Sequence, residues 1–215
     1  MRTFVKFCGI TESSSLAEVP EGGAAGFVIG LPASPRNLEV EAAARLVEEL
    51  PKGAEAWAVV VDPPAELIHR LFDEVGVDRI QVGGAIPPDL EFLEIHHLVP
   101  SLPIPLMGTT GAEPKVPPAE DYARLHLDAT GAPVLDGSAR QVDWEMCRGL
   151  VQTQPGRKLV LAGGLTAENV GAALEAVGPW GVDVTQSVES VPGKKDTERL
   201  RAFVKAVLDF EASHP

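Results

Sequence analysis

The sequence has few cysteines and few basic residues, and each shortage argues against a class of protein. Its 215 residues include two cysteines, Cys8 and Cys147. They lie far apart and match no zinc-ligand spacing, so we expect neither a disulfide framework nor a metal site. Lysine and arginine number 18 against 31 acidic residues, a formal net charge of −13. Because nucleic-acid binding needs clustered positive charge, we expect no nucleic-acid partner.

Long apolar runs and several well-known catalytic motifs are also missing. The longest apolar runs, such as residues 57–61 and 159–162, are far shorter than the roughly 20 residues that cross a bilayer. The N-terminal residues lack the apolar core and cleavage site of a signal peptide, so we expect a cytoplasmic protein without a membrane partner. There is no Gly-x-x-x-x-Gly-Lys, His-Glu-x-x-His or Gly-x-Ser-x-Gly motif, which argues against nucleotide hydrolysis, metalloprotease chemistry and serine hydrolysis.

The sequence does contain an alternation of short β-rich runs with helical stretches, which favours parallel strands joined by crossover helices. Strands are predicted at residues 4–8, 25–29, 56–61, 79–82, 104–107, 125–127, 158–161 and 182–185. Helices are predicted at residues 39–50, 64–74, 166–177 and 197–210, and loops over 100–118, which are rich in proline and glycine. With no linker dividing the chain, this pattern predicts an α/β fold, a single (β/α)8 TIM barrel over residues 1–215, rather than an open doubly wound sheet.

Three side chains able to act on or hold a ligand follow predicted strands, at the barrel end where chemistry is expected. Cys8 ends the first strand, where a following helix N-terminus would favour its thiolate as a general base; a buried structural cysteine is the alternative. Asp128 ends the sixth strand as a proton donor or as the cap of a turn. Arg36 suits a carboxylate or phosphate, or is a solvated loop residue. His126 is expected to be half-buried and structural, and Cys147 to pack in the core.

A Gly-Gly pair follows the seventh predicted strand. Gly163 and Gly164 would let backbone N–H groups approach a ligand, and Thr166 would cap a helix whose positive end faces the same place. The next strand end brings Gln186 and Ser187, and barrels often bind phosphate between these two loops. The segment therefore predicts a phosphate site, with a simple tight turn as the alternative.

Several segments in this order resemble phosphoribosylanthranilate isomerase over nearly the whole chain. They are residues 5–11, 34–36, 127–128, 142–144, 161–165, 182–184, 188–189 and 192–196. The most specific are the Lys-x-Cys-Gly-Ile-Thr start and the Leu-Ala-Gly-Gly-Leu segment, because both occur at the separations that the family shows.

The resemblance implies an isomerase of tryptophan biosynthesis that acts on a phosphorylated small molecule without cofactor or metal, as a monomer or homodimer. It would convert N-(5-phosphoribosyl)anthranilate into the open-chain carboxyphenylamino deoxyribulose phosphate by an Amadori rearrangement. Asp128 would protonate the ribose ring oxygen, and Cys8, with a modestly lowered pKa, would remove the proton from the adjacent carbon. Arg36 would hold the anthranilate carboxylate. The phosphate would be bound by Gly163, Gly164 and the backbone around Gln186 and Ser187.

Some positions depart from the family pattern. Gly83 stands where the family usually has a histidine, and Ser187 stands where bare glycine backbone usually meets the phosphate. The Gly-Gly-Thr-Gly loop after the sixth strand is replaced by a segment ending at Ala139. These changes keep open an alternative function, a non-catalytic or repurposed paralogue that binds a phosphorylated small molecule. A sugar-phosphate enzyme that uses a lysine is not favoured, since Lys195, for example, is expected in a terminal loop.

Overall fold

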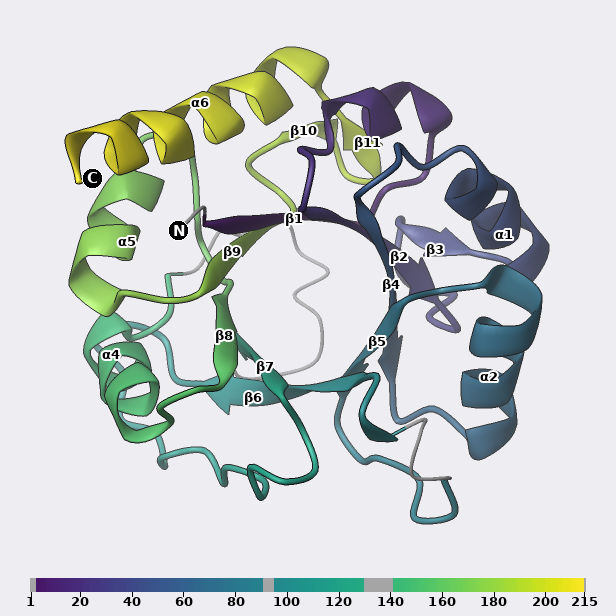
Figure 1. Cartoon of the computed structure of the whole chain (residues 1–215), viewed down its shortest axis with the longest axis horizontal. Helices are drawn as coiled ribbons and strands as arrows, with labels where there is room; N and C mark the ends of the chain where they lie inside the picture. The colour runs from purple at the N-terminus through teal and green to yellow at the C-terminus, as the bar shows by residue number, and fades with distance from the viewer. Residues whose placement is uncertain (1–2, 91–94, 130–140, 215) are drawn as a thin grey trace.

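The computed structural model describes residues 3–90, 95–129 and 141–214. Eight parallel strands form a closed ring at its centre (Figure 1). They are β1 (Phe4–Cys8), β2 (Ala24–Ile29), β4 (Glu55–Val61), β5 (Arg79–Gly83), β6 (Leu98–Ile104), β7 (Arg124–Ala129), β8 (Lys158–Leu161) and β9 (Gly181–Val184). They follow one another in chain order, and β1 closes the ring by pairing with both β2 and β9. The predicted (β/α)8 barrel is confirmed.

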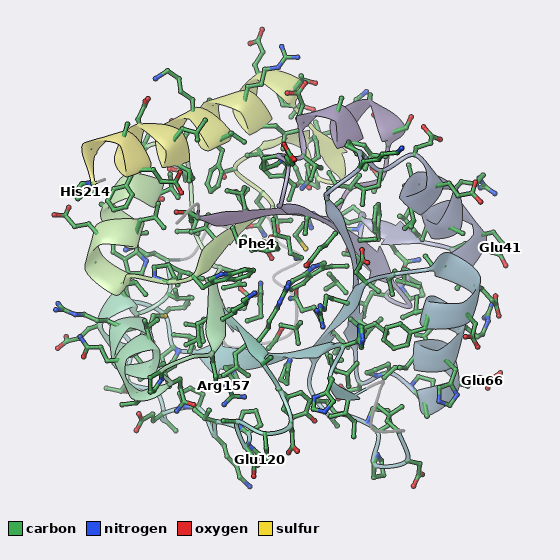
Figure 2. The ribbon with its side chains drawn as sticks, in the orientation of Figure 1. Phe4, Glu41, Glu66, Glu120, Arg157 and His214 are labelled. Atoms are coloured by element: carbon green, nitrogen blue, oxygen red, sulfur yellow. The ribbon has the colours of Figure 1, made fainter. Side chains whose placement is uncertain are left out.

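The helices lie outside the ring (Figure 1). They are the 3₁₀ helix η1 (Ser13–Glu18), α1 (Val40–Glu48), α2 (Ala65–Arg70) with its π-helical continuation η2 (Leu71–Val75), α4 (Trp144–Thr153), α5 (Val170–Val177) and α6 (Thr197–Ser213). Each long helix buries its apolar face against the strands. Figure 2 shows the opposite, charged face, with Glu41 and Glu66 on the outer sides of α1 and α2. Among the described residues, no helix is long and apolar enough to span a membrane.

Helices α4 and α6 begin where the side chain of an aspartate accepts a backbone hydrogen bond. Asp143 accepts from the Met146 N–H at 3.1 Å, and Asp196 accepts from the Arg199 N–H at 3.1 Å. Each bond satisfies one N–H that the first helical turn leaves without a partner. Cys147 of α4 is fully buried, as predicted for a packing residue.

One predicted strand is misplaced and shares a single residue, Ile104, with an observed strand, whereas the others largely coincide with observed strands. We expected a strand at residues 104–107, but β6 covers Leu98–Ile104. The error comes from Pro100 and Pro103, which we interpreted as loop residues. A residue in a parallel ladder directs its N–H to only one neighbouring strand, so a proline removes one ladder bond at most. The shift places Ser101 inside the barrel.

Alternation along β1 divides its side chains into an inner and an outer set. Phe4, Lys6 and Cys8 face the interior of the ring, whereas Phe7 faces outward and packs edge-on against Phe203 of α6, with ring centroids 6.5 Å apart. Successive side chains of a strand point to opposite faces, so every second residue of β1 reaches the interior. Cys8 follows Lys6 by two residues and Phe4 by four, so its side chain faces the interior as theirs do.

Aromatic side chains fill the barrel near the N-terminal ends of the strands. Phe4 stacks on Trp180 at a centroid distance of 4.4 Å and lies 5.6 Å from Trp57. Arg124 lies over the Trp180 ring at 4.9 Å and forms hydrogen bonds of 2.5 and 2.9 Å with the carboxylate of Glu55. These contacts close the N-terminal end of the barrel, so a ligand has access from the opposite end.

Candidate active site

A cavity of about 580 Å³ opens at the C-terminal ends of the strands. Its volume falls within the range of about 300–1,000 Å³ that is common for small-molecule sites, and this end of a barrel is where catalytic sites lie. The structure brings all the predicted site residues to its lining, namely Cys8, Arg36, Asp128, Gly163, Gly164, Gln186 and Ser187.

Cys8 and Asp128 reach the cavity from different walls. Cys8 is the last residue of β1 and is 8% exposed. Asp128 lies near the end of β7, and its Oδ1 accepts a hydrogen bond of 2.8 Å from the Ala129 N–H. This local bond lies within β7 and holds the carboxyl group at the strand end, where Asp128 lines the cavity.

The thiol of Cys8 does not have the lowered pKa that we expected. Burial is the largest influence and raises the pKa of Cys8. The ammonium groups of Lys6 and Lys195 oppose this rise, and the Asp183 carboxylate adds to it. Our prediction considered a helix N-terminus but not the cost of placing a thiolate in a buried site. The thiol therefore needs additional positive charge nearby before it can act as a base near neutral pH.

A chain of buried polar side chains crosses the barrel one layer below Cys8. The Nζ of Lys6 donates to Oδ2 of Asp183 at 2.7 Å, and the same oxygen lies 2.8 Å from Nε2 of His126. Nδ1 of His126 lies 3.2 Å from Nε2 of Gln81, which also donates to Oγ of Ser101 at 3.2 Å. His126 is 1% exposed, so our expectation of a half-buried residue is wrong. It faces the interior of the ring, where the other strands cover it completely.

Lys6 and Asp183 form the charged centre of this chain. Burial alone would lower the pKa of Lys6, but the Asp183 carboxylate and the Cys8 sulfur outweigh it, so the pKa is raised. Burial alone would raise the pKa of Asp183, but Lys6 and His126 outweigh it, so that pKa is lowered. Sequence reasoning missed Asp183. A signal was available in the sequence, because Lys6 and Asp183 are each a charged residue within an otherwise apolar strand. In the structure the two are register partners on β1 and β9.

A second buried cluster surrounds Arg36. Its Nε and Nη2 donate to the two carboxylate oxygens of Glu189 at 2.8 and 2.6 Å. Nζ of Lys195 donates to the same carboxylate at 3.0 Å and to the Thr185 carbonyl at 2.9 Å. Arg36 is 5% exposed, so it is not a solvated loop residue. The Nη1 edge of its guanidinium forms no hydrogen bond with any described residue and remains available to a ligand.

The expectation for Lys195 is also wrong. Rather than lying in a terminal loop, it is buried in a small hairpin of β10 (Glu189–Val191) and β11 (Lys194–Lys195), where Glu189 is its register partner. Burial lowers the pKa of Lys195, and Glu189 opposes that change. The hairpin therefore places a buried cation close enough to Cys8 to favour its thiolate form.

Gly9, directly after Cys8, makes room for Arg36. A Cβ atom at this position would lie 2.5 Å from Cδ of Arg36, and the backbone has a φ of +74°, which disfavours other residues. The Cys-Gly pair thus lets the arginine cross the end of β1 towards Glu189.

The loop after β8 has the form expected of a phosphate cradle. Gly163 and Gly164 have φ values of +87° and +73°. The Asn169 side chain braces the loop by accepting from the Thr166 N–H at 2.8 Å and donating to the Gly164 carbonyl at 2.9 Å. Oγ1 of Thr166 accepts a hydrogen bond of 3.2 Å from the Glu168 N–H, so Thr166 caps the turn that leads into α5. The helix itself begins four residues later than predicted, at Val170.

Comparison with known proteins identifies the family. Residues 5–206 match the family model for N-(5'phosphoribosyl)anthranilate (PRA) isomerase. The chain belongs to the phosphoribosylanthranilate isomerase family. A curated N-(5'-phosphoribosyl)anthranilate isomerase from Paramagnetospirillum magneticum is 36% identical over 211 residues, which cover 94% of this chain and 95% of the relative.

Solved structures of phosphoribosylanthranilate isomerases agree with this assignment. The enzyme from Thermus thermophilus is 30% identical, with a TM-score of 0.75, and the match covers 97% of this chain and 99% of that one. Another solved phosphoribosylanthranilate isomerase is 28% identical, with a TM-score of 0.72 and coverage of 96% and 99%. It is in complex with reduced 1-(o-carboxyphenylamino)-1-deoxyribulose 5-phosphate.

The departures from the usual phosphoribosylanthranilate isomerase pattern fall on the cavity lining. Gly83 lines the cavity at the end of β5 without a side chain. Ser187 also lines it, and its Oγ donates to the Leu165 carbonyl at 2.7 Å. That bond turns the hydroxyl towards the loop after β8 and ties the two phosphate-side loops together. Ala139 lies outside the described residues.

Proposed function

We propose that this chain catalyses the Amadori rearrangement of N-(5-phosphoribosyl)anthranilate to the carboxyphenylamino deoxyribulose phosphate. The reaction is an aldose–ketose isomerisation within one molecule and needs two proton transfers and no cofactor. The observation that carries the proposal is the presence of Cys8 and Asp128 on different walls of one cavity. A general acid and a general base can then approach the same sugar from two directions.

In the proposed mechanism, Asp128 in its acid form donates a proton to the ring oxygen of the ribose. The bond from that oxygen to C1 breaks, and the nitrogen lone pair forms an iminium. Cys8 as thiolate removes the proton from C2, and the electrons of that C–H bond neutralise the iminium to give an enolamine. Transfer of the C2 hydroxyl proton to C1 then yields the ketone.

The raised pKa of Cys8 is consistent with this order of steps. Burial disfavours the thiolate, whereas a positive charge within a few ångströms favours it. Ring opening would create such a charge, the iminium, next to the carbon that must be deprotonated. We infer that Cys8 is activated by the reaction intermediate in addition to Lys6 and Lys195.

The remaining predicted residues would hold the two ends of the substrate. The Nη1 edge of Arg36 would bind the anthranilate carboxylate, because Glu189 already occupies its Nε and Nη2. The backbone of Gly163 and Gly164, with the loop of Gln186 and Ser187, would bind the phosphate. A family member of known structure binds the reduced product analogue, a ligand that carries both a carboxylate and a phosphate.

The test combines complementation with kinetics. We expect the wild-type gene to restore growth of a tryptophan auxotroph that lacks this isomerase. In the purified protein, Cys8→Ala and Asp128→Asn should each lower kcat by about 10² to 10⁴. Binding of the reduced product analogue, followed by calorimetry, should stay within about tenfold, because neither group is the main anchor of the carboxylate or phosphate. Cys147→Ser, a thiol substitution outside the cavity lining, should leave kcat near the wild-type value.

The alternative of a non-catalytic paralogue rests on Gly83 and Ser187, where the cavity lining departs from the usual family pattern. Tight binding of the product analogue by a folded wild-type protein without turnover would favour this alternative. Full activity of Asp128→Asn would refute the role assigned to that residue.

A further inference from the structure

Two buried oxygen atoms at the floor of the cavity lack a hydrogen-bond partner among the described residues. They are Oε1 of Gln81 and Oδ1 of Asp183. The two residues are 5% and 4% exposed, and both line the cavity. Buried side-chain oxygens in native proteins nearly always have a donor, so an unpaired one calls for an explanation. Two of them in one cavity point to a ligand.

The network around His126 fixes which end of the Gln81 amide is unpaired. In the neutral imidazole, the Nε2–H of His126 donates to the Asp183 carboxylate and Nδ1 is an acceptor. Nδ1 has Nε2 of Gln81 at 3.2 Å and Oγ of Ser101 at 3.4 Å. A reversed Gln81 amide would set its oxygen against the Nδ1 lone pair, so the NH₂ group faces His126 and the carbonyl points elsewhere. The second amide hydrogen is directed to Ser101. Both donors of Gln81 are thus in use, and Oε1 can only accept.

The two carboxylate oxygens of Asp183 also differ in whether they have a hydrogen-bond donor. Oδ2 receives both the Lys6 ammonium and the His126 imidazole. Oδ1 receives neither, and the lowered pKa of Asp183 keeps the group ionised and unable to donate. The floor of the cavity therefore presents two acceptors and is complementary to O–H or N–H donors. A phosphate or carboxylate oxygen would be repelled there.

The position of this acceptor pair matches the part of the substrate that carries hydroxyl groups. Gln81 lies two residues before Gly83, the last residue of β5, and Asp183 lies one residue before the end of β9, so they form the layer directly below Cys8 and Asp128. Phosphate and anthranilate ends are assigned to the rim, and the pentose would lie between them above this floor.

We propose that Gln81 Oε1 and Asp183 Oδ1 form a subsite that accepts hydrogen bonds from hydroxyl groups of the pentose. The inference rests on the proposed function, which supplies the sugar. It assigns Gln81 and Asp183 to substrate recognition in addition to the acid–base pair. A site built around unpaired acceptors discriminates strongly against a ligand that lacks the matching donor.

The experiment is a calorimetric series with the reduced open-chain product analogue and with analogues that each lack one hydroxyl of the carbohydrate chain. We expect the wild type to bind at least one deoxy analogue about tenfold to a hundredfold more weakly than the parent, because removing a hydroxyl leaves a buried acceptor unpaired. In Gln81→Leu, parent affinity should fall by a similar factor, and removal of the matching hydroxyl should cause no further loss.

Ser101→Ala is the matched control. It removes the other partner of the Gln81 amide and leaves Oε1 in place, so it should retain the wild-type discrimination between parent and deoxy analogue. Equal binding of the parent and every deoxy analogue by the wild type would overturn the subsite while the proposed function stands. Failure of the parent analogue to bind would overturn both. Because the wild-type series decides by itself, the result does not depend on whether Gln81→Leu folds.

Discussion

Replacing Glu189 with glutamine should destabilise the protein by about 3–5 kcal/mol, because it removes the carboxylate that pairs with both Arg36 and Lys195 in a buried ion cluster. The side chains of Arg36, Glu189 and Lys195 are 6%, 4% and 1% exposed. Glu189 forms hydrogen bonds of 2.8 and 2.6 Å with Arg36 and of 3.0 Å with Lys195. The amide would leave two buried cations without a compensating charge. For a chain of this length, the loss corresponds to a fall in Tm of roughly 6–20 °C.

The effect of Glu189→Gln should depend on pH in a defined direction. Burial tends to raise the pKa of Glu189, but Arg36 and Lys195 outweigh it, so the pKa is lowered from its ordinary value of 4.5. A carboxylate with a lowered pKa stabilises the folded state above its unfolded pKa, and this contribution is lost as pH falls through the folded pKa. The difference in the free energy of unfolding between wild type and variant should therefore have its full value at pH 7 and decrease below about pH 4.5.

Urea unfolding of both proteins at pH 7 and at stepwise lower pH measures this difference in the free energy of unfolding. Glu175→Gln is the control, since Glu175 is exposed on α5 and its replacement should change the free energy of unfolding by no more than about 0.5 kcal/mol. The affinity of Glu189→Gln for the reduced product analogue should also fall, because Arg36 would no longer be held in one orientation. A loss of less than about 1 kcal/mol at pH 7 would refute the reasoning.

Two further predictions concern Cys147 and the turn after β5. Burial raises the pKa of Cys147 from 9.0 to about 12, so its stabilising contribution is present below the unfolded pKa and is lost as pH rises. Between pH 8 and pH 10 the wild type should lose about 1.4 kcal/mol more stability than Cys147→Ala in urea unfolding, and equal losses would contradict this. Gly84→Ala should lower stability by about 1–2 kcal/mol or more, because φ is +77° and the added Cβ would lie 2.2 Å from Oδ1 of Asp62. Gly83→Ala, whose Cβ would be 3.3 Å from Val61, should cost less in thermal unfolding, and the reverse order would contradict the argument.

The order of strands and helices could be predicted from sequence because it depends on local patterns. Continuous apolar runs separated by amphipathic segments indicate parallel strands and crossover helices. The prediction was wrong at β6, where Pro100 and Pro103 obscured the apolar pattern. Only the neighbouring strands, which supply the remaining ladder bonds, show that a strand is stable there.

The position of the cavity could also be predicted, because the end of each strand specifies where its following loop begins. Cys8 and Asp128 were found in this way. The two buried clusters were not, since the partners of Lys6 and Arg36 lie more than 150 residues away along the chain, at Asp183 and Glu189.

The sequence by itself determined the barrel, the family resemblance and the residues at the cavity mouth, because alternation and strand ends are local properties. Tertiary structure alone decided the pKa of Cys8, the burial of Lys195 and the unpaired oxygens of Gln81 and Asp183. Desolvation and hydrogen-bond pairing depend on which distant groups surround an atom, and closure of the ring sets those surroundings.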